Sequence, residues 1–108
     1  MEPGDRTRRL EQGLDHVVRR RILRALHSRP DGEASPVSLA EADLRDEPLS
    51  GVAYHARVLE SYKLIGLVGH QRDQTYQRAV YASLVEEEPE VLELLAQAEE
   101  LDARPRTR

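Results

Sequence analysis

Residues 50–62 read Ser-Gly-Val-Ala-Tyr-His-Ala-Arg-Val-Leu-Glu-Ser-Tyr, and this stretch decides the predicted fold. At about 100° of rotation per residue, a helix here places Val52, Ala56 and Leu59 on one apolar side. We expect Ser50 to cap this helix and the helix to run to about residue 62. The opposite side is polar and consists of Ser50, Tyr54, Arg57 and Ser61.

Two patterns predict helices before this stretch. The apolar residues of 16–28 recur at helical spacing, with Asp15 as the expected N-cap, and the Pro and Gly of 29–32 end that helix. Ser38 begins an S-x-x-E sequence, the spacing of a capping box, so a second helix is expected from Ser38 to about residue 44. The first helix is expected to bury Val18, Ile22, Ala25 and Leu26, with Leu23 at the edge of the stripe.

Downstream, the apolar period changes to two, as expected for strands. Residues 67–72 and 76–82 are the predicted strands of a hairpin that turns at 73–75. Residues 86–103 return to helical spacing, with an acidic first turn that complements the helix dipole. The apolar stripe of this last helix is narrow, which favours packing against a partner helix and predicts a homodimer. The predicted dimer interface consists of Val91, Leu94, Leu95, Ala98 and Leu101.

The length and composition fit a small protein that is mainly α with a small β-hairpin. A chain of 108 residues has room for a single small core. We expect a flexible lead-in over 1–13, a folded domain over 14–84, a dimerisation helix over 85–103 and a basic tail over 104–108. No apolar run reaches the roughly 18 residues that span a bilayer, and the first residues lack the apolar stretch of a secretory signal, so a cytoplasmic protein is expected. The lack of Cys excludes disulfides, thiolate metal sites and cysteine nucleophiles.

The predicted order of helix, short helix, helix and hairpin is that of a winged helix-turn-helix, whose third helix enters a DNA major groove. The chain resembles the ArsR-like winged-helix regulators over about 14–82. LDHVVRRRIL at 14–23 is similar to that family's first-helix signature, SLA at 38–40 to the start of its second helix, and VAYHARVL at 52–59 followed by LI at 64–65 to its recognition helix and exit. The resemblance implies a DNA-binding transcription regulator whose winged helix-turn-helix carries a C-terminal dimerisation helix.

Three positions depart from the pattern of that family. The family has Ser, Leu and Gly where this chain has Ala53, Ala56 and Lys63. Ala53 removes a contact to phosphate or base, Ala56 loosens the core, and Lys63 puts a side chain where a positive φ is expected. Many family members sense metals through Cys, which this chain lacks, so that form of regulation does not carry over. No metal ligand and no cofactor are assigned; a His or carboxylate metal site between subunits is an alternative for which the sequence shows no ligand motif.

The polar side of 50–62 is the side predicted to face DNA. Arg57 would contact guanine or a phosphate, Tyr54 a thymine methyl or a phosphate, and Ser50 a phosphate; the alternative is an ordinary solvated helix face. The hairpin would bring further basic side chains to the DNA backbone or minor groove, although a hairpin surface often carries such charges. His55 lies on the flank of the apolar side, and we expect it to pack or hydrogen-bond instead of reading bases. The predicted DNA contacts are Ser50, Tyr54, Arg57, Ser61, His70, Arg72 and Arg78.

The net charge of −4 hides segregated blocks. Residues 1–30 carry a net +4, 31–48 a net −5, 49–80 a net +2 and 81–108 a net −5. The acidic block at 31–48 would repel phosphate near the second helix. It motivates an alternative function, a winged-helix protein-interaction module that binds another protein through its acidic helix.

The remaining charged and titratable residues suggest no catalysis. No two His stand four residues apart, no Gly-rich phosphate loop follows a strand, and Cys is absent, so we do not expect an enzyme. On the first helix, Arg20, Arg21 and Arg24 are expected to face solvent or the DNA backbone. Arg19 is expected on the inward edge in a buried ion pair, with Glu60 as one candidate partner.

Overall fold

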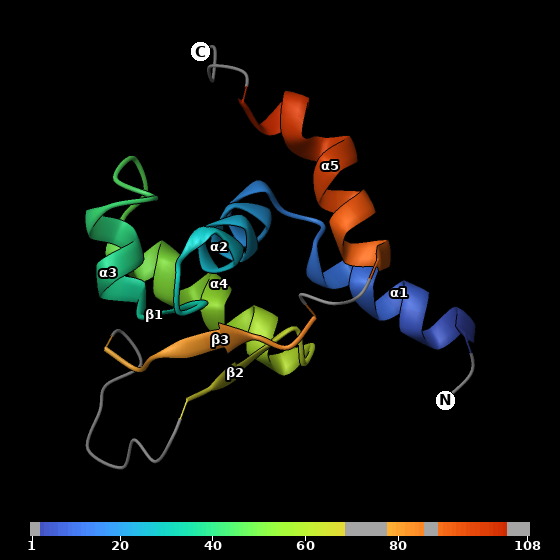
Figure 1. Ribbon diagram of the computed structural model, residues 1–108, viewed down its shortest axis with the longest axis horizontal. Coiled ribbons are helices and arrows are strands. Elements are labelled where there is room, and N and C mark those ends of the chain that lie inside the picture. The colour runs from blue at the N-terminus through green and yellow to red at the C-terminus, as the bar shows by residue number, and fades with distance from the viewer. Residues whose placement is uncertain (1–2, 69–77, 86–88, 104–108) are drawn as a thin grey trace.

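The computed structural model describes residues 3–68, 78–85 and 89–103 (Figure 1). It is mainly helical with a small three-stranded antiparallel sheet, which confirms the predicted fold class at that level. No helix within these ranges is long and apolar enough to cross a membrane. The elements in chain order are α1 (Pro3–Gly13), α2 (Val17–Ser28), β1 (Glu33–Ala34), α3 (Pro36–Glu41), α4 (Leu49–Ser61), β2 (Ile65–Leu67), β3 (Tyr81–Ser83) and α5 (Pro89–Ala103).

The sheet has the order β1-β3-β2, so the third strand pairs with both of the others. Ile65 pairs with Ser83 and Leu67 with Tyr81, and the ladder continues where the Val68 amide donates to the Val80 carbonyl at 2.9 Å. Strand β2 begins two residues before the predicted strand 67–72, and β3 ends one residue after the predicted strand 76–82. The predicted turn lies outside the described residues. The sequence analysis missed β1, because a strand of two residues is too short to show a period.

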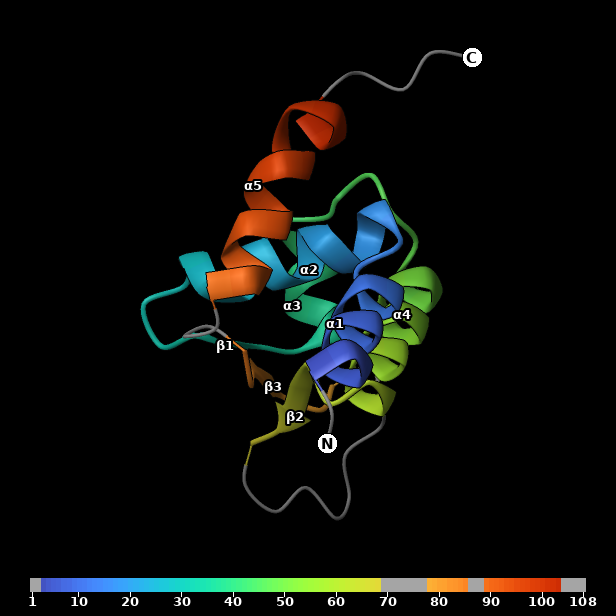
Figure 2. The ribbon, with the colours of Figure 1, turned by 90° about the vertical axis from the view of Figure 1, so that its right-hand side faces the viewer.

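Helix α2 lies at the centre of the molecule, and other elements cover its apolar stripe on several sides. Ile22, Leu23 and Leu26 are completely buried. Figure 2 shows α4 and α5 on opposite sides of α2, with the sheet at one end of the assembly. The sheet contributes Tyr81, a buried aromatic side chain in a core that contains no Phe or Trp. All the side chains predicted to face inward from the first helix are buried.

Helix α1 occupies most of the segment that was expected to be a flexible or partly helical lead-in over 1–13. Its last turn carries Leu10, which is 1% exposed and belongs to the hydrophobic core together with Leu14. A Cβ at Gly13 would overlap the side chain of Leu64, so the lack of a side chain there allows α1 to approach the rest of the domain. The bounds of this helix were not predicted because the first residues are mostly charged or polar, and the single Leu of α1 is too weak a signal.

The N-termini of the helices also differ from the prediction. Helix α2 is capped by His16, whose Nδ1 accepts from the Val18 amide at 3.1 Å, and not by Asp15. The capping box of α3 joins Ser35 and Ser38, so this helix begins about one turn earlier than expected. Helix α4 begins after Pro48, and no side-chain hydrogen bond caps it, so the predicted cap at Ser50 is wrong.

At the end of α4 the chain turns through a left-handed residue. Lys63 has a φ of 62°, as the sequence suggested. Its amide donates to the Glu60 carbonyl at 2.9 Å, and the Leu64 amide donates to the Leu59 carbonyl at 3.0 Å. These two bonds satisfy carbonyls of the last turn and direct the chain into β2.

Candidate nucleic-acid interface

The polar face predicted for the third helix is present on α4. Its inner side, which includes Val52, Ala56 and Leu59, is buried against α2 and α3. Its outer side is exposed, and the exposed fraction of the Tyr54 side chain reaches 63%. Helix α5 packs on the other side of α2 and leaves this outer side uncovered (Figure 2). The predicted contact residues that share the exposed side are Ser50, Tyr54, Arg57 and Ser61.

The C-terminal half of this face is a shallow depression that mixes aromatic, basic and acidic groups. It is lined by Tyr54, Arg57, Val58, Glu60 and Ser61. The Ser61 hydroxyl donates to the Val58 carbonyl at 2.6 Å, so its proton is already engaged within the helix. Ser61 is therefore better placed to accept a hydrogen bond than to donate one to a phosphate.

The predicted wing is described only in part. Arg78 is exposed just before β3. His70 and Arg72 lie outside the described residues. The hairpin stem formed by β2 and β3 is the part of the wing that the structure places.

His55 stacks on His16 and does not belong to the outer row of α4. The two ring centroids are 4.0 Å apart, and the neighbouring Tyr54 ring makes a T-shaped contact with His55 at 5.0 Å between centroids. Burial, followed by the nearby charges of His16 and Arg19, lowers the pKa of His55, while Glu47 acts in the opposite direction. The contact joins the first turn of α2 to the middle of α4, in agreement with the packing role expected for His55.

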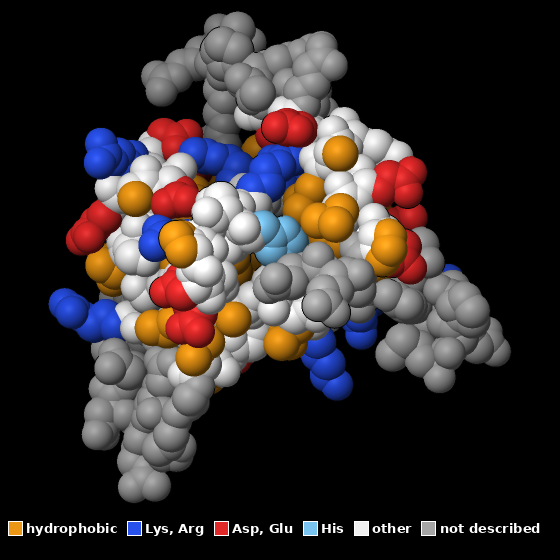
Figure 3. Space-filling view, viewed as in Figure 1, with side chains coloured by type: hydrophobic (Ala, Val, Ile, Leu, Met, Phe, Trp, Pro, Cys, Tyr) orange, Lys and Arg blue, Asp and Glu red, His pale blue; other side chains and the backbone are white. Residues whose placement is uncertain are grey.

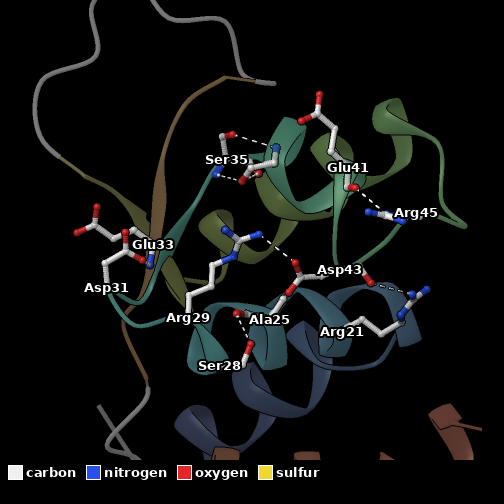
Figure 4. Close-up of polar contacts among 11 residues, drawn as sticks. Arg21, Ala25, Ser28, Arg29, Asp31, Glu33, Ser35, Glu41, Asp43 and Arg45 are labelled. Carbon is white, nitrogen blue, oxygen red and sulfur yellow. Dashed lines mark hydrogen bonds and ion pairs between the residues drawn. The ribbon is translucent and has the colours of Figure 1, made fainter.

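The acidic residues between α3 and α4 are paired with arginines of α2. Arg21 binds Asp46 at 2.7 Å and approaches Glu47 at 3.5 Å, and Arg29 binds Asp43 at 2.9 Å. Figure 4 shows Arg21 and Arg29 reaching from α2 to the Asp43 segment. The charge of this segment is therefore partly compensated within the chain.

Arg20 and Arg24 carry a role that the sequence analysis missed. Both bind Asp102 near the end of α5, and the side chain of Asp102 is only 5% exposed. The hydrogen bond from Arg20 is the main cause that lowers the pKa of Asp102, and the same bond raises the pKa of Arg20. The lowered pKa of Asp102 and the raised pKa of Arg20 both favour the charged form of the group. Arg19 does not form the expected pair with Glu60: its guanidinium donates to the Gln12 carbonyl at 3.3 Å.

The residues predicted for a dimer interface do not all remain available. Val91 is 0% exposed and Leu95 is 6% exposed, and both belong to the core of their own chain. These two side chains are thus already buried within their own chain, in which α5 packs against α2, and they expose little surface to a partner. Leu94 and Ala98 are half-buried, and the side chain of Leu101 lies outside the described part of the chain. Leu94 and Ala98 line a shallow groove with Glu11, Leu14, Asp15, Arg20 and Gln97.

In the described ranges, no three His, Asp or Glu side chains converge in a way that could hold a metal ion. Comparison with protein-family models, with curated proteins and with solved structures gives no match for this chain.

Proposed function

We propose that this chain is a winged helix-turn-helix transcription regulator that binds double-stranded DNA as a homodimer. Helix α4 would enter the major groove, and the β2–β3 hairpin would approach the DNA backbone. The single observation that carries the proposal is the exposed polar row on α4, which lies opposite a fully buried apolar row on the same helix. An α-helix with an exposed polar side fits a major groove about 12 Å wide.

The arrangement around α4 supports this use. Helix α3 packs across α4, and the antiparallel sheet with the order β1-β3-β2 follows directly. The resemblance of the sequence to the ArsR-like regulators implies the same succession of elements. The hairpin would then lie beside the groove that α4 occupies.

Three side chains of α4 would make the main contacts. Arg57 carries a planar guanidinium that can bind the O6 and N7 atoms of a guanine with two hydrogen bonds. The ring of Tyr54 makes a T-shaped contact with His55, and Tyr54 is 63% exposed, so it could reach a thymine methyl or a phosphate. Ser50 stands in the first turn of α4, which holds no acidic residue and whose backbone amides favour a phosphate.

The pairing of the acidic residues favours DNA binding over the protein-interaction alternative. A free acidic surface between α3 and α4 would repel phosphate and attract a basic protein. Instead, Asp43, Asp46 and Glu47 are held by Arg21 and Arg29, which reduces their net charge toward either partner.

The proposed homodimer uses the part of α5 that the core leaves open. Leu94 and Ala98 are half-buried and line the groove between α5 and the α1–α2 junction. A second copy of α5 would cover these side chains and place two α4 helices on one DNA duplex. Two weak half-site contacts then act together, which compensates for the net acidic charge of the chain.

A mobility-shift experiment with DNA selected from a random pool tests this proposal. Arg57→Ala should weaken binding by about 1–3 kcal/mol per half-site, roughly 5- to 150-fold. Arg8→Ala is the matched control, since Arg8 is an exposed arginine on α1, and it should leave the affinity unchanged. Equal binding by the Arg57→Ala variant, or no binding by the folded wild-type protein at low salt, would contradict the proposal.

A further inference from the structure

Helix α5 is held on the rest of the chain by apolar contacts in its first half and by polar contacts in its second half. In its first half, Val91 and Leu95 are buried in the core. In its second half, the apolar contact becomes weaker, and Asp102 is the deeply covered side chain among those described there. The other described side chains of this half, which are exposed or half-buried, are Ala96, Gln97, Ala98 and Glu99.

Asp102 receives hydrogen bonds from two arginines of α2. Arg20 donates to it through Nε at 2.9 Å and Nη2 at 2.7 Å, and Arg24 donates through Nη1 at 2.7 Å. Each arginine also has a second anchor: Arg20 donates to the Leu14 carbonyl at 2.8 Å, and Arg24 to the Leu95 carbonyl at 2.7 Å. We refer to Arg20, Arg24 and Asp102 as the clasp. It connects the α1–α2 junction, α2 and two points along α5.

The geometry of the clasp restricts the direction of α5. A guanidinium that binds both oxygens of a carboxylate through parallel hydrogen bonds tolerates little rotation. Asp102 is seven residues beyond Leu95 and lies on the same side of the helix as the buried stripe. A tilt of α5 about its buried first half would therefore pull Asp102 away from both arginines.

When α5 tilts about its buried first half, its far end moves by a larger distance than its first half. A helix of 15 residues is about 22 Å long. Figures 1 and 2 show the C-terminal end of α5 projecting beyond the rest of the molecule. A partner bound along this helix would be displaced accordingly.

We infer that Asp102 is a positioning residue: by binding Arg20 and Arg24 together, it fixes the angle of α5 on α2 and thereby sets the separation of the two α4 helices in the homodimer. This inference rests on the proposed function. Two half-sites one helical turn apart, roughly 34 Å, are read together only when the two reading helices are held at a matching distance. The clasp would thus determine which half-site spacing the dimer accepts, without touching DNA.

The first test measures the clasp without DNA. Because the chain contains no Cys, spin labels can be attached at Glu41→Cys on α3 and Ala96→Cys on α5, both exposed positions. The spin-labelled protein is diluted with unlabelled protein, so that pulsed electron paramagnetic resonance reports the distance between the two labels within one chain. Asp102→Asn should broaden that distance distribution, whereas Glu99→Gln, which changes an exposed carboxylate on the same helix, should not. Identical distributions for Asp102→Asn and wild type would overturn the inference.

The second test measures half-site spacing. Duplexes carry two copies of a half-site selected by the wild-type protein, with the spacer changed one base pair at a time. Wild type and Glu99→Gln should prefer one spacing, and Asp102→Asn should lose that preference while its affinity for an isolated half-site is unchanged. A preference retained by Asp102→Asn overturns the inference.

The tests also decide the inference if Asp102→Asn does not fold or if the wild-type protein binds no DNA. If circular dichroism shows that Asp102→Asn does not fold, Arg24→Gln, which keeps the pair between Arg20 and Asp102, carries both tests with the same expected direction. If the wild-type protein binds no duplex, the proposed function fails and the spacing role fails with it. The distance measurement then still decides whether the clasp fixes α5.

Discussion

Lys63 holds a backbone conformation that an L-residue with a Cβ adopts at a cost. Its φ of 62° is required because the two amides that follow α4 turn back onto carbonyls of the last turn. Glycine would relieve this strain of about 1–2 kcal/mol, but it would also add entropy to the unfolded chain, so the net gain is smaller.

We therefore expect Lys63→Gly to raise the free energy of unfolding by about 0.5–1 kcal/mol. Urea denaturation followed by circular dichroism measures the change. Lys63→Ala is the control, because it removes the charged chain but keeps the Cβ and should give no comparable gain. A lower urea midpoint for the glycine variant would contradict this account of the turn.

The lowered pKa of His55 makes the free energy of unfolding depend on pH. Burial is the main cause that lowers the pKa of His55 in the folded protein below its ordinary value of 6.5. As the pH falls below 6.5, the unfolded chain binds this proton more readily than the folded chain, so stability decreases. The contribution is fully present above that pH and is lost on acidification.

Urea denaturation at about pH 7.5 and pH 5.5 checks the sign, and the free energy of unfolding should be lower at the acidic value. His55→Gln should reduce the difference between the two conditions. The depressed pKa of Asp102 acts in the same direction but at a lower pH, below its ordinary value of 3.8, so the two effects separate. A pH dependence between 5.5 and 7.5 that is unchanged in His55→Gln would exclude this assignment.

At the scale of single elements, the N-terminus of α3 provides a direct comparison of two serines. Ser35 accepts from the Ser38 amide at 3.2 Å, and the Ser38 hydroxyl accepts from the Ser35 amide at 3.3 Å. Ser50 stands in the first turn of α4, where no side-chain hydrogen bond forms the cap. We expect Ser35→Ala to lower the free energy of unfolding by about 1 kcal/mol. Ser50→Ala should change it by less than about 0.5 kcal/mol, as for an ordinary surface position, and equal effects in thermal denaturation would contradict the assignment.

Periodicity in the sequence was sufficient for the long elements. The apolar spacings around Ile22, Leu59 and Leu95 predicted α2, α4 and α5, and the polar row of α4 followed from the same spacing. Helix ends were harder, because the residue that caps a helix depends on where the preceding segment enters. Ser38 and Ser50 both fit the composition of a cap, yet the caps are at Ser35 and Pro48.

Long-range polar contacts could not be predicted from the sequence. Arg20 and Asp102 are separated by 82 residues, and nothing in their local sequence distinguishes them from other charged surface residues. A weak signal exists in hindsight: two arginines four residues apart on α2, and a carboxylate that continues the apolar stripe of α5. The same limit explains why Val91 and Leu95 were assigned to a dimer, because a narrow stripe does not tell a partner chain from the chain's own α2.

At the scale of the whole molecule, the face drawn in Figure 3 shows no dominant sign of charge among the described residues. Figure 3 shows basic and acidic side chains interspersed on the face that carries the end of α2 and the first part of α5. The pairs between α2 and the acidic segment, and those of the clasp, account for several of these charges. Association of two copies would therefore depend on the apolar groove on α5 more than on a broad electrostatic attraction.

Ala98→Glu should abolish the proposed dimer while leaving the monomer folded, because Ala98 is half-buried at the groove. Val91→Glu should instead unfold the chain, since it buries a charge in a core position that is 0% exposed. Sedimentation velocity reports the association state, and circular dichroism reports folding. A folded dimer of the Ala98→Glu variant would exclude this groove as the interface.

The surface of α4 that meets DNA can be mapped residue by residue. Amide chemical shifts of the isotope-labelled protein are recorded by NMR while a duplex selected by the wild-type chain is added. The account predicts that the largest changes fall on α4, around Tyr54 and Arg57, and on the hairpin stem next to Arg78. Changes confined to α5 or to the acidic segment between α3 and α4, with α4 unaffected, would contradict it.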